Sequence, residues 1–165
     1  DAEGLSEDGS PWVDFVRLWP AIGFAGSGLA KWAEKGQWEP LEVGGAVNIL
    51  GQMVEIIEAQ SISIARIGIQ PGQDIPVSAV AGPVHPNLRG EVESRRFAGR
   101  LEALLHDAHK GAHVVVSVNP KDLHLAKGVS NINTRSLTHR HQLASMQFET
   151  DADVARGTVS VARIE

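Results

Sequence analysis

The sequence predicts an α/β protein in which a βαβ-type unit is followed by a small α+β unit. Three observations predict this class. Residues 12–20 and 61–70 are short apolar runs rich in β-branched and aromatic side chains, which is typical of buried strands. The stretch between them carries apolar residues at helical spacing. Beyond residue 110, three further strand-like runs surround one helical segment.

The first strand stops at Pro20, and glycines in the following loop lead into a short helix that ends near Gly36. A longer helix starts at Pro40, where the missing N–H of proline costs little. Its apolar stripe predicts the face that packs on the strands. The stripe consists of Val43, Ala46, Val47, Leu50, Val54 and Ile57.

The second strand, residues 61–70, follows this helix, so parallel pairing through a right-handed crossover is expected. Residues 71–88 then form a long loop with four prolines. Loops of that length in compact domains are more often functional than not. A helix over about 90–110 comes next, and its inner face is predicted to hold Phe97, Leu101, Leu104, Leu105 and Ala108.

The last third of the chain predicts a small β-α-β-β unit. Residues 113–118 read as a strand, about 120–140 as helical, and 143–149 and 157–164 as terminal strands. We therefore expect a flexible lead-in over 1–11, a first domain over 12–110 and a second domain over 111–165.

Composition excludes several classes of protein. The 165 residues carry a formal charge of −5, with 42% hydrophobic and 21% charged residues, as in an ordinary globular protein. Cysteine is absent, which excludes disulfides, thiolate zinc sites, a cysteine nucleophile and any iron–sulfur cluster ligated within this chain. No secretory signal and no apolar run of about 20 residues is visible. We expect a cytoplasmic protein without membrane contact or a metal site of its own.

Two arginines interrupt the apolar strands. Arg17 and Arg66 must each find a carboxylate, a ligand or solvent, because a buried unpaired charge is costly. Asp14, Asp74 and Glu93 could serve as internal partners. The alternative is an anionic ligand at the strand ends, where α/β sheets and barrels place their sites.

The segment AGPVHPNLRGEVESR forms a second candidate. This stretch of loop and helix start follows a strand; two prolines stiffen it, and it carries an imidazole and several guanidinium groups. Helix capping and surface salt bridges explain some of these residues. A wall of an active site is the other interpretation, and its residues are His85, Arg89, Glu91, Glu93, Arg95 and Arg96.

A spaced series of motifs carries a family resemblance. It includes Trp19–Pro20, Gly28–Leu29, Pro40–Leu41 and the run from Arg66 to Gln70, and covers about residues 12–135. This series resembles the C-terminal half of Elongator-type radical S-adenosylmethionine proteins. It is closest to the bacterial subgroup labelled as coproporphyrinogen oxidase-related iron–sulfur oxidoreductases, which lacks the acetyltransferase domain.

The resemblance implies that the first domain holds the last strands of a partial β/α barrel. The strand ends would face S-adenosylmethionine or the substrate, and the proline-rich loop would close the site. The residues implied in binding are Arg17, Arg66, Gln70, His85, Arg89, Glu93 and Arg95.

The family's three-cysteine motif lies on an earlier barrel loop and is missing from this chain. S-adenosylmethionine and a 4Fe–4S cluster would therefore belong to a parent protein, and this chain alone would be inactive. It is either a C-terminal fragment or a stand-alone relative that has lost the chemistry, and the start at Asp1 favours a fragment. Its expected partner is the missing N-terminal half of the barrel or a second copy, because an unpaired strand edge invites association.

Two alternatives remain. The terminal unit could bind RNA, such as transfer RNA, through Lys121, Lys127, Arg135 and Arg140. The net charge of −5 and the scarcity of aromatic residues in that unit oppose this interpretation. The chain could also be a structural interaction domain without catalysis.

Overall fold

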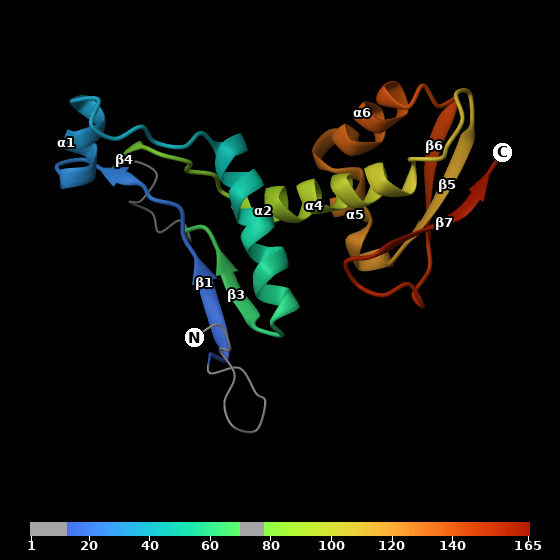
Figure 1. Ribbon diagram of the computed structural model, residues 1–165, viewed down its shortest axis with the longest axis horizontal. Coiled ribbons are helices and arrows are strands. Elements are labelled where there is room, and N and C mark those ends of the chain that lie inside the picture. The colour runs from blue at the N-terminus through green and yellow to red at the C-terminus, as the bar shows by residue number, and fades with distance from the viewer. Residues whose placement is uncertain (1–12, 70–77) are drawn as a thin grey trace. The chain divides into compact units, whose positions relative to one another are not determined.

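The computed structural model describes residues 13–69 and 78–165, and this part of the chain is mixed α/β (Figure 1). It divides into two compact units, and the boundary along the chain lies inside α4 (Leu88–Leu104), between Val92 and Glu93. The sequence suggested a boundary near residue 110. The division lies earlier because the second half of α4 contributes Phe97 and Leu101 to the cores of the second unit. The expected lead-in over 1–11 lies outside the described residues.

The first unit is built around a parallel strand pair. Strands β1 and β3 pair in parallel, and α2 connects them, so the predicted βαβ unit is confirmed. A second, antiparallel pair joins β2 to β4, two strands too short for periodicity to reveal. The elements of this unit are β1 (Phe15–Leu18), β2 (Gly23–Phe24), α1 (Gly28–Glu34), α2 (Val43–Ala59), β3 (Ser63–Ile67) and β4 (Ala79–Ala81).

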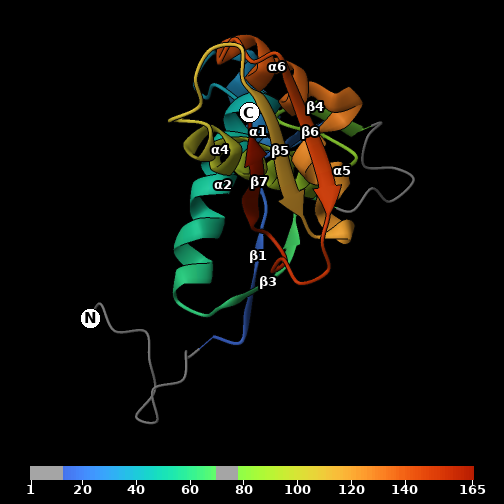
Figure 2. The same cartoon turned by 90° about the vertical axis from the view of Figure 1, so that its right-hand side faces the viewer.

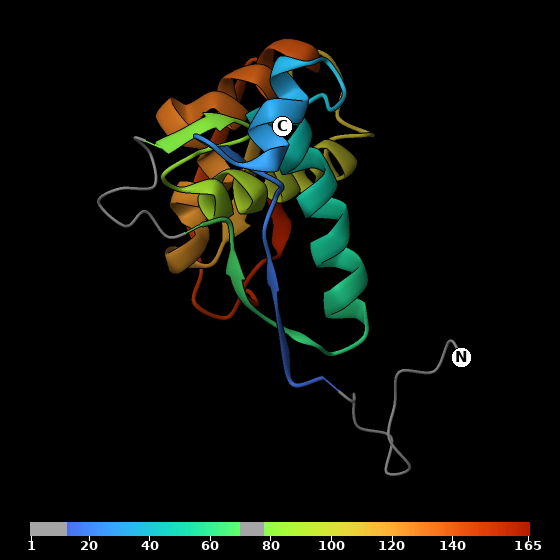
Figure 3. The ribbon, with the colours of Figure 1, turned by 90° about the vertical axis from the view of Figure 1, so that its left-hand side faces the viewer.

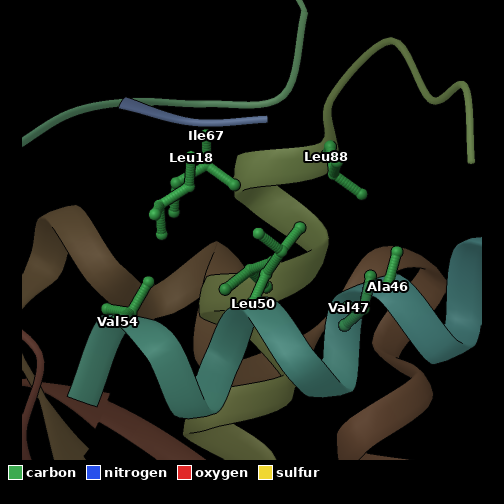
Figure 4. Close-up of a cluster of buried hydrophobic side chains, with 8 residues drawn as sticks. Leu18, Ala46, Val47, Leu50, Val54, Ile67 and Leu88 are labelled. Atoms are coloured by element: carbon green, nitrogen blue, oxygen red, sulfur yellow. The ribbon is translucent and has the colours of Figure 1, made fainter. Parts of the chain in front are cut away.

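Helix α2 uses its predicted stripe to cover one face of the strand pair. It begins at Val43 rather than at Pro40. Leu18 and Ile67, one from each strand, lie over Leu50 of the helix (Figure 4). Val43 and Ile57, at the two ends of the stripe, are partly buried against this core. The buried core of the unit comprises Leu18, Ala46, Val47, Leu50, Val54, Ile67, Leu88 and Val92.

A second apolar face of α2 is exposed. Ile49, Met53 and Ile56 follow one another at i, i+4 and i+7, and they are 47%, 40% and 66% exposed. A helix that is apolar on nearly all sides is normally covered on more than one side. This face therefore has the composition of a contact surface.

The end of β3 requires a glycine. Gly68 has a φ of +79°, and a Cβ atom built on it would lie 3.0 Å from the Cβ atom of Leu88. Its N–H donates to the carbonyl oxygen of Leu18 at 2.8 Å, which extends the pairing with β1. Any other side chain would be strained by the positive φ and would crowd Leu88.

The second unit has a three-stranded sheet with β5 in the centre, parallel to β6 and antiparallel to β7 (Figure 2). The predicted β-α-β-β order is confirmed. The preceding helix α4 ends at Leu104 and not near residue 110. The elements after it are β5 (His113–Val118), the 3-10 turn η1 (Pro120–Asp122), α5 (Leu123–Lys127), the turn η2 (Val129–Asn131), α6 (Ile132–Arg140), β6 (Ser145–Thr150) and β7 (Val159–Ile164).

The expected helical segment over 120–140 is broken in its middle. Gly128, Ser130 and Asn131 all have positive φ angles, so the chain turns between α5 and α6. The buried amide of Asn133 fixes this turn. Its Nδ2 atom donates to the carbonyl oxygens of Ser94 and Ala126, at 3.0 and 3.1 Å.

A buried carboxylate holds the connection between β6 and β7. The Asp122 side chain is 2% exposed, and it accepts hydrogen bonds from Arg156 Nε at 2.8 Å and from the Gly157 N–H at 2.7 Å. Burial by itself raises the pKa of Asp122, but these two hydrogen bonds and the charge of Arg156 outweigh it and lower the pKa. Asp122 is therefore held as the ionised, hydrogen-bonded form.

Candidate functional site

The parallel strand pair places two arginines side by side. Arg17 of β1 and Arg66 of β3 are register partners, and the next pair along the strands is Leu18 with Ile67. Leu18 and Ile67 face α2 (Figure 4). Since successive side chains point to opposite faces of a strand, both arginines lie on the face turned away from α2.

Neither arginine has an acidic partner in the described part of the chain. Of the three expected partners, Glu93 pairs with Arg96 at 3.0 Å, and Asp14 forms no ion pair with another described residue. Asp74 lies outside the described residues. Two like charges in directly paired positions are destabilising when nothing lies between them. The interpretation as ordinary ion pairs therefore finds no support within these ranges.

Aromatic side chains flank Arg17. Neither was predicted as a site residue, and Trp19 was named only as part of a family motif. The Arg17 guanidinium carbon lies 5.9 Å from the centre of the Phe15 ring, which is 53% exposed. Trp19 directly follows β1 and is 59% exposed. The alternation of the strand was the available signal, because it sets Phe15 on the same face as Arg17.

The strand pair is open. Among the described strands β1 and β3 pair only with each other, and no closed barrel is present in these ranges (Figure 3). A two-stranded parallel sheet leaves unpaired backbone groups along both outer edges. The face that carries Arg17 and Arg66 is thus part of an incomplete sheet.

The other candidate residues of the first unit have local roles. Arg89 donates from Nη1 to the carbonyl oxygen of Ile64 at 3.3 Å, so it ties the start of α4 to β3. His85 Nδ1 accepts the Asn87 N–H at 3.2 Å in the turn before α4. Gln70 lies outside the described residues. The prediction that these groups line one site remains a prediction.

Glu93 and Arg95 fall in the second unit. Arg95 lines a pocket of about 280 Å³ between α4 and α6. Glu102 lies in the same pocket, where its two oxygens contact Arg140 Nη1 at 2.7 Å and His141 Nε2 at 2.9 Å. The negative charge of Glu102 is thus balanced within the pocket by Arg140.

The basic residues weighed for RNA binding lie on three different segments of the second unit. Lys121 is in η1, Lys127 ends α5, and Arg135 and Arg140 are in α6. Arg140 is already paired with Glu102. Their role in binding RNA remains a prediction.

No described helix is long and apolar enough to cross a membrane. Within the same ranges, no group of three histidine, aspartate or glutamate side chains is arranged to hold a metal ion.

Comparison with known proteins gives one match. No curated protein and no solved structure matches the chain significantly. A family model described as the Radical_SAM C-terminal domain matches residues 13–96, just over half of the chain. This match covers the whole described part of the first unit, including the strand pair with Arg17 and Arg66. The chain therefore belongs to the family of radical S-adenosylmethionine C-terminal domains.

Proposed function

We propose that this chain is the C-terminal portion of an Elongator-type radical S-adenosylmethionine oxidoreductase and that its strand pair forms part of the wall of the substrate site. The match over residues 13–96 carries this proposal. The βαβ arrangement of β1, α2 and β3 supports it, because this is the repeating unit of a β/α barrel. In such a barrel the face away from the helix is the interior, which is the face of Arg17 and Arg66.

The chain's own residues do not fit an iron–sulfur cluster. The 165 residues include no cysteine, and clusters of this kind are held by cysteine thiolates. The cluster that the family implies, which supplies the electron for S-adenosylmethionine cleavage, would be bound by cysteines of another polypeptide segment. The contribution proposed for this chain is to bind and orient the substrate.

The partner proposed for this chain is the cluster-bearing N-terminal half of the barrel. The edges of β1 and β3, which are unpaired among the described strands, can be extended by further strands that would satisfy their backbone groups. The exposed side chains Ile49, Met53 and Ile56 of α2 provide apolar surface for neighbouring helices. A second copy of the chain is the competing partner.

Reconstitution with iron and sulfide tests this proposal. The 165-residue chain alone should hold no cluster, measured by absorbance and iron content. The chain joined to the polypeptide encoded before it should hold one and should form 5′-deoxyadenosine from S-adenosylmethionine under reducing conditions.

The matched control replaces the cysteines of that preceding segment by alanine, which should abolish both signals. A preceding segment without closely spaced cysteines would contradict the proposal. A cluster bound by the 165-residue chain alone would contradict it as well.

A further inference from the structure

We infer that Arg17 and Arg66 together bind the phosphate dianion of a substrate that carries a planar ring. The inference deepens the proposed function, on which it rests for the position of this face inside a barrel. It names a class of substrate, the phosphate monoesters of ring-bearing molecules such as nucleotides.

The first argument is the unbalanced charge of the pair. Arg17 and Arg66 are direct register neighbours on strands that lie about 4.8 Å apart, and no carboxylate lies within ion-pair distance of either in the described ranges. Such a pair is unfavourable by itself. An oxyanion between the two guanidinium groups converts the repulsion into two charge-assisted contacts, and the planar fork of arginine matches phosphate geometry.

The second argument concerns which anion fits. A phosphate monoester carries about −1.5 to −2 charges at pH 7, which balances two arginines. A single carboxylate would neutralise only one of them. S-adenosylmethionine has one carboxylate, one ammonium and one sulfonium group, so it is a net cation. The two arginines therefore do not fit that molecule, and they fit an anionic substrate.

The third argument is the aromatic surface beside the pair. Phe15 and Trp19 lie before and after Arg17 in the sequence and expose 53% and 59% of their surface. Exposed aromatic side chains next to cationic groups provide stacking surfaces for planar rings, including nucleobases. The phosphate would bind the arginines while the ring contacts the aromatic side chains.

Titration calorimetry of the 165-residue chain tests the inference with four probes. Adenosine 5′-monophosphate should bind most tightly, and inorganic phosphate should bind more weakly because it lacks the ring. Adenosine and S-adenosylmethionine should not bind at this pair. A short RNA with a 5′-phosphate, compared with the same RNA with a 5′-hydroxyl, distinguishes a nucleic-acid end from a free nucleotide.

Substitutions locate the binding. Arg17→Gln and Arg66→Gln should each weaken binding of adenosine monophosphate by about tenfold or more, as expected for loss of a hydrogen bond to a charged group. Arg163→Gln removes the same charge from an exposed arginine of β7 and should change binding less than about twofold. Trp19→Ala should weaken binding of adenosine monophosphate and leave inorganic phosphate unaffected.

Two further readouts separate a binding role from a structural one. Binding should strengthen between pH 5.5 and 7.5, because the second proton leaves a phosphate monoester near pH 6. The Gln variants should also be as stable in phosphate-free buffer as the wild type, since each removes one of two repelling charges. A structural role for these arginines predicts lower stability instead.

Equal binding by the two Gln variants and by the Arg163→Gln variant would overturn the inference. The inference would also be overturned if adenosine monophosphate at millimolar concentration gave no heat of binding. Circular dichroism must show that the chain used is folded. Cleavage of S-adenosylmethionine by the reconstituted protein would leave the proposed function standing in either case. Phosphate binding by the arginine pair, together with a preceding segment that lacks closely spaced cysteines, would leave the ligand inference standing and contradict the proposed function.

Discussion

At the scale of single residues, Asp122 decides how the second unit closes. Its carboxylate is almost fully buried, and both of its oxygens accept hydrogen bonds from the loop between β6 and β7. Asn119 reinforces the same contact, because its Nδ2 atom donates to the carbonyl oxygen of Val154 at 2.9 Å. The turn after β5 thus orders a loop more than thirty residues away in the sequence.

We predict that Asp122→Asn lowers the free energy of unfolding by about 1–3 kcal/mol, the usual range for a buried hydrogen-bond acceptor that loses its partners. Urea unfolding measures this change. Asp107→Asn serves as the control, because Asp107 is exposed in the same unit, and it should change stability by less than about 0.5 kcal/mol. Equal effects of the two substitutions would contradict the role assigned to Asp122.

The lowered pKa of Asp122 also predicts a pH dependence of stability. Its pKa in the folded chain lies below the value of about 3.9 for a solvated aspartate, so the unfolded chain takes up the proton first as the pH falls. The stabilisation is therefore complete above about pH 5 and is lost as the pH falls through the folded-state pKa. Unfolding measured from pH 6 to pH 2.5 should show a smaller acid loss in the Asp122→Asn variant than in the wild type.

At the scale of elements, the break between α5 and α6 depends on a glycine. Gly128 has a φ of +73°, and a Cβ atom there would lie 2.8 Å from Cγ2 of Ile132 and 3.0 Å from Cγ of Asn133. The side chain of Asn133 carries the hydrogen bonds that join α4 to this turn. A substitution at Gly128 therefore disturbs the turn and that amide together.

We predict that Gly128→Ala destabilises the chain by more than about 2 kcal/mol, because it adds steric overlap to the strain of a positive φ. Gly111→Ala is the matched control. Gly111 has a φ of +82°, but nothing lies within 4 Å of the position of its Cβ atom, so only the strain of about 1 kcal/mol applies. Thermal unfolding of both variants checks the difference, and equal melting temperatures would refute the contact argument.

At the scale of the whole molecule, the first unit exposes strand edges and an apolar helix face that no described residue covers. The edges of β1 and β3 are unpaired among the described strands, and α2 exposes Ile49, Met53 and Ile56. An edge strand and an apolar helix face both favour association. We expect this surface to be covered by the cluster-bearing half of the barrel and to promote self-association in its absence.

We predict that light scattering after size exclusion gives a mass above 17.7 kDa for the isolated chain at high concentration. Ile56→Gln should lower the apparent mass, because it places an amide in the exposed face of α2. Val129→Gln changes a residue of the second unit with nearly the same exposure, 65% against 66%, and should leave the mass unchanged. A strict monomer for the wild-type chain at high concentration would argue against this surface.

Much of the fold could be predicted because the spacing of apolar residues along the chain indicates which side chains are buried. The apolar stripe of α2 and the two strands around it follow from spacing alone, and so does the β-α-β-β order of the second unit. The short pair β2 and β4 could not be predicted, since two or three residues carry no period. The break at Gly128 was missed although its residues signal it, because Gly128, Ser130 and Asn131 are poor helix formers that favour turns.

The candidate site, like the fold, could be predicted from the sequence only in part. The sequence singled out Arg17 and Arg66 because a charge inside an apolar strand needs a partner. It could not show that they are register neighbours, since register depends on a bulge in β3 relative to β1. Nor could it show that Arg89 and Glu93 are engaged with Ile64 and Arg96.

The sequence by itself determined the fold class, the buried stripes and the lack of any thiolate ligand for a cluster, because these depend on residue type and spacing. Only the tertiary structure decided which side chains are neighbours: Arg17 beside Arg66, Asp122 beneath Arg156, and Asn133 against Ser94. The physical reason is that contacts between distant segments depend on register, turns and packing, and composition leaves these open.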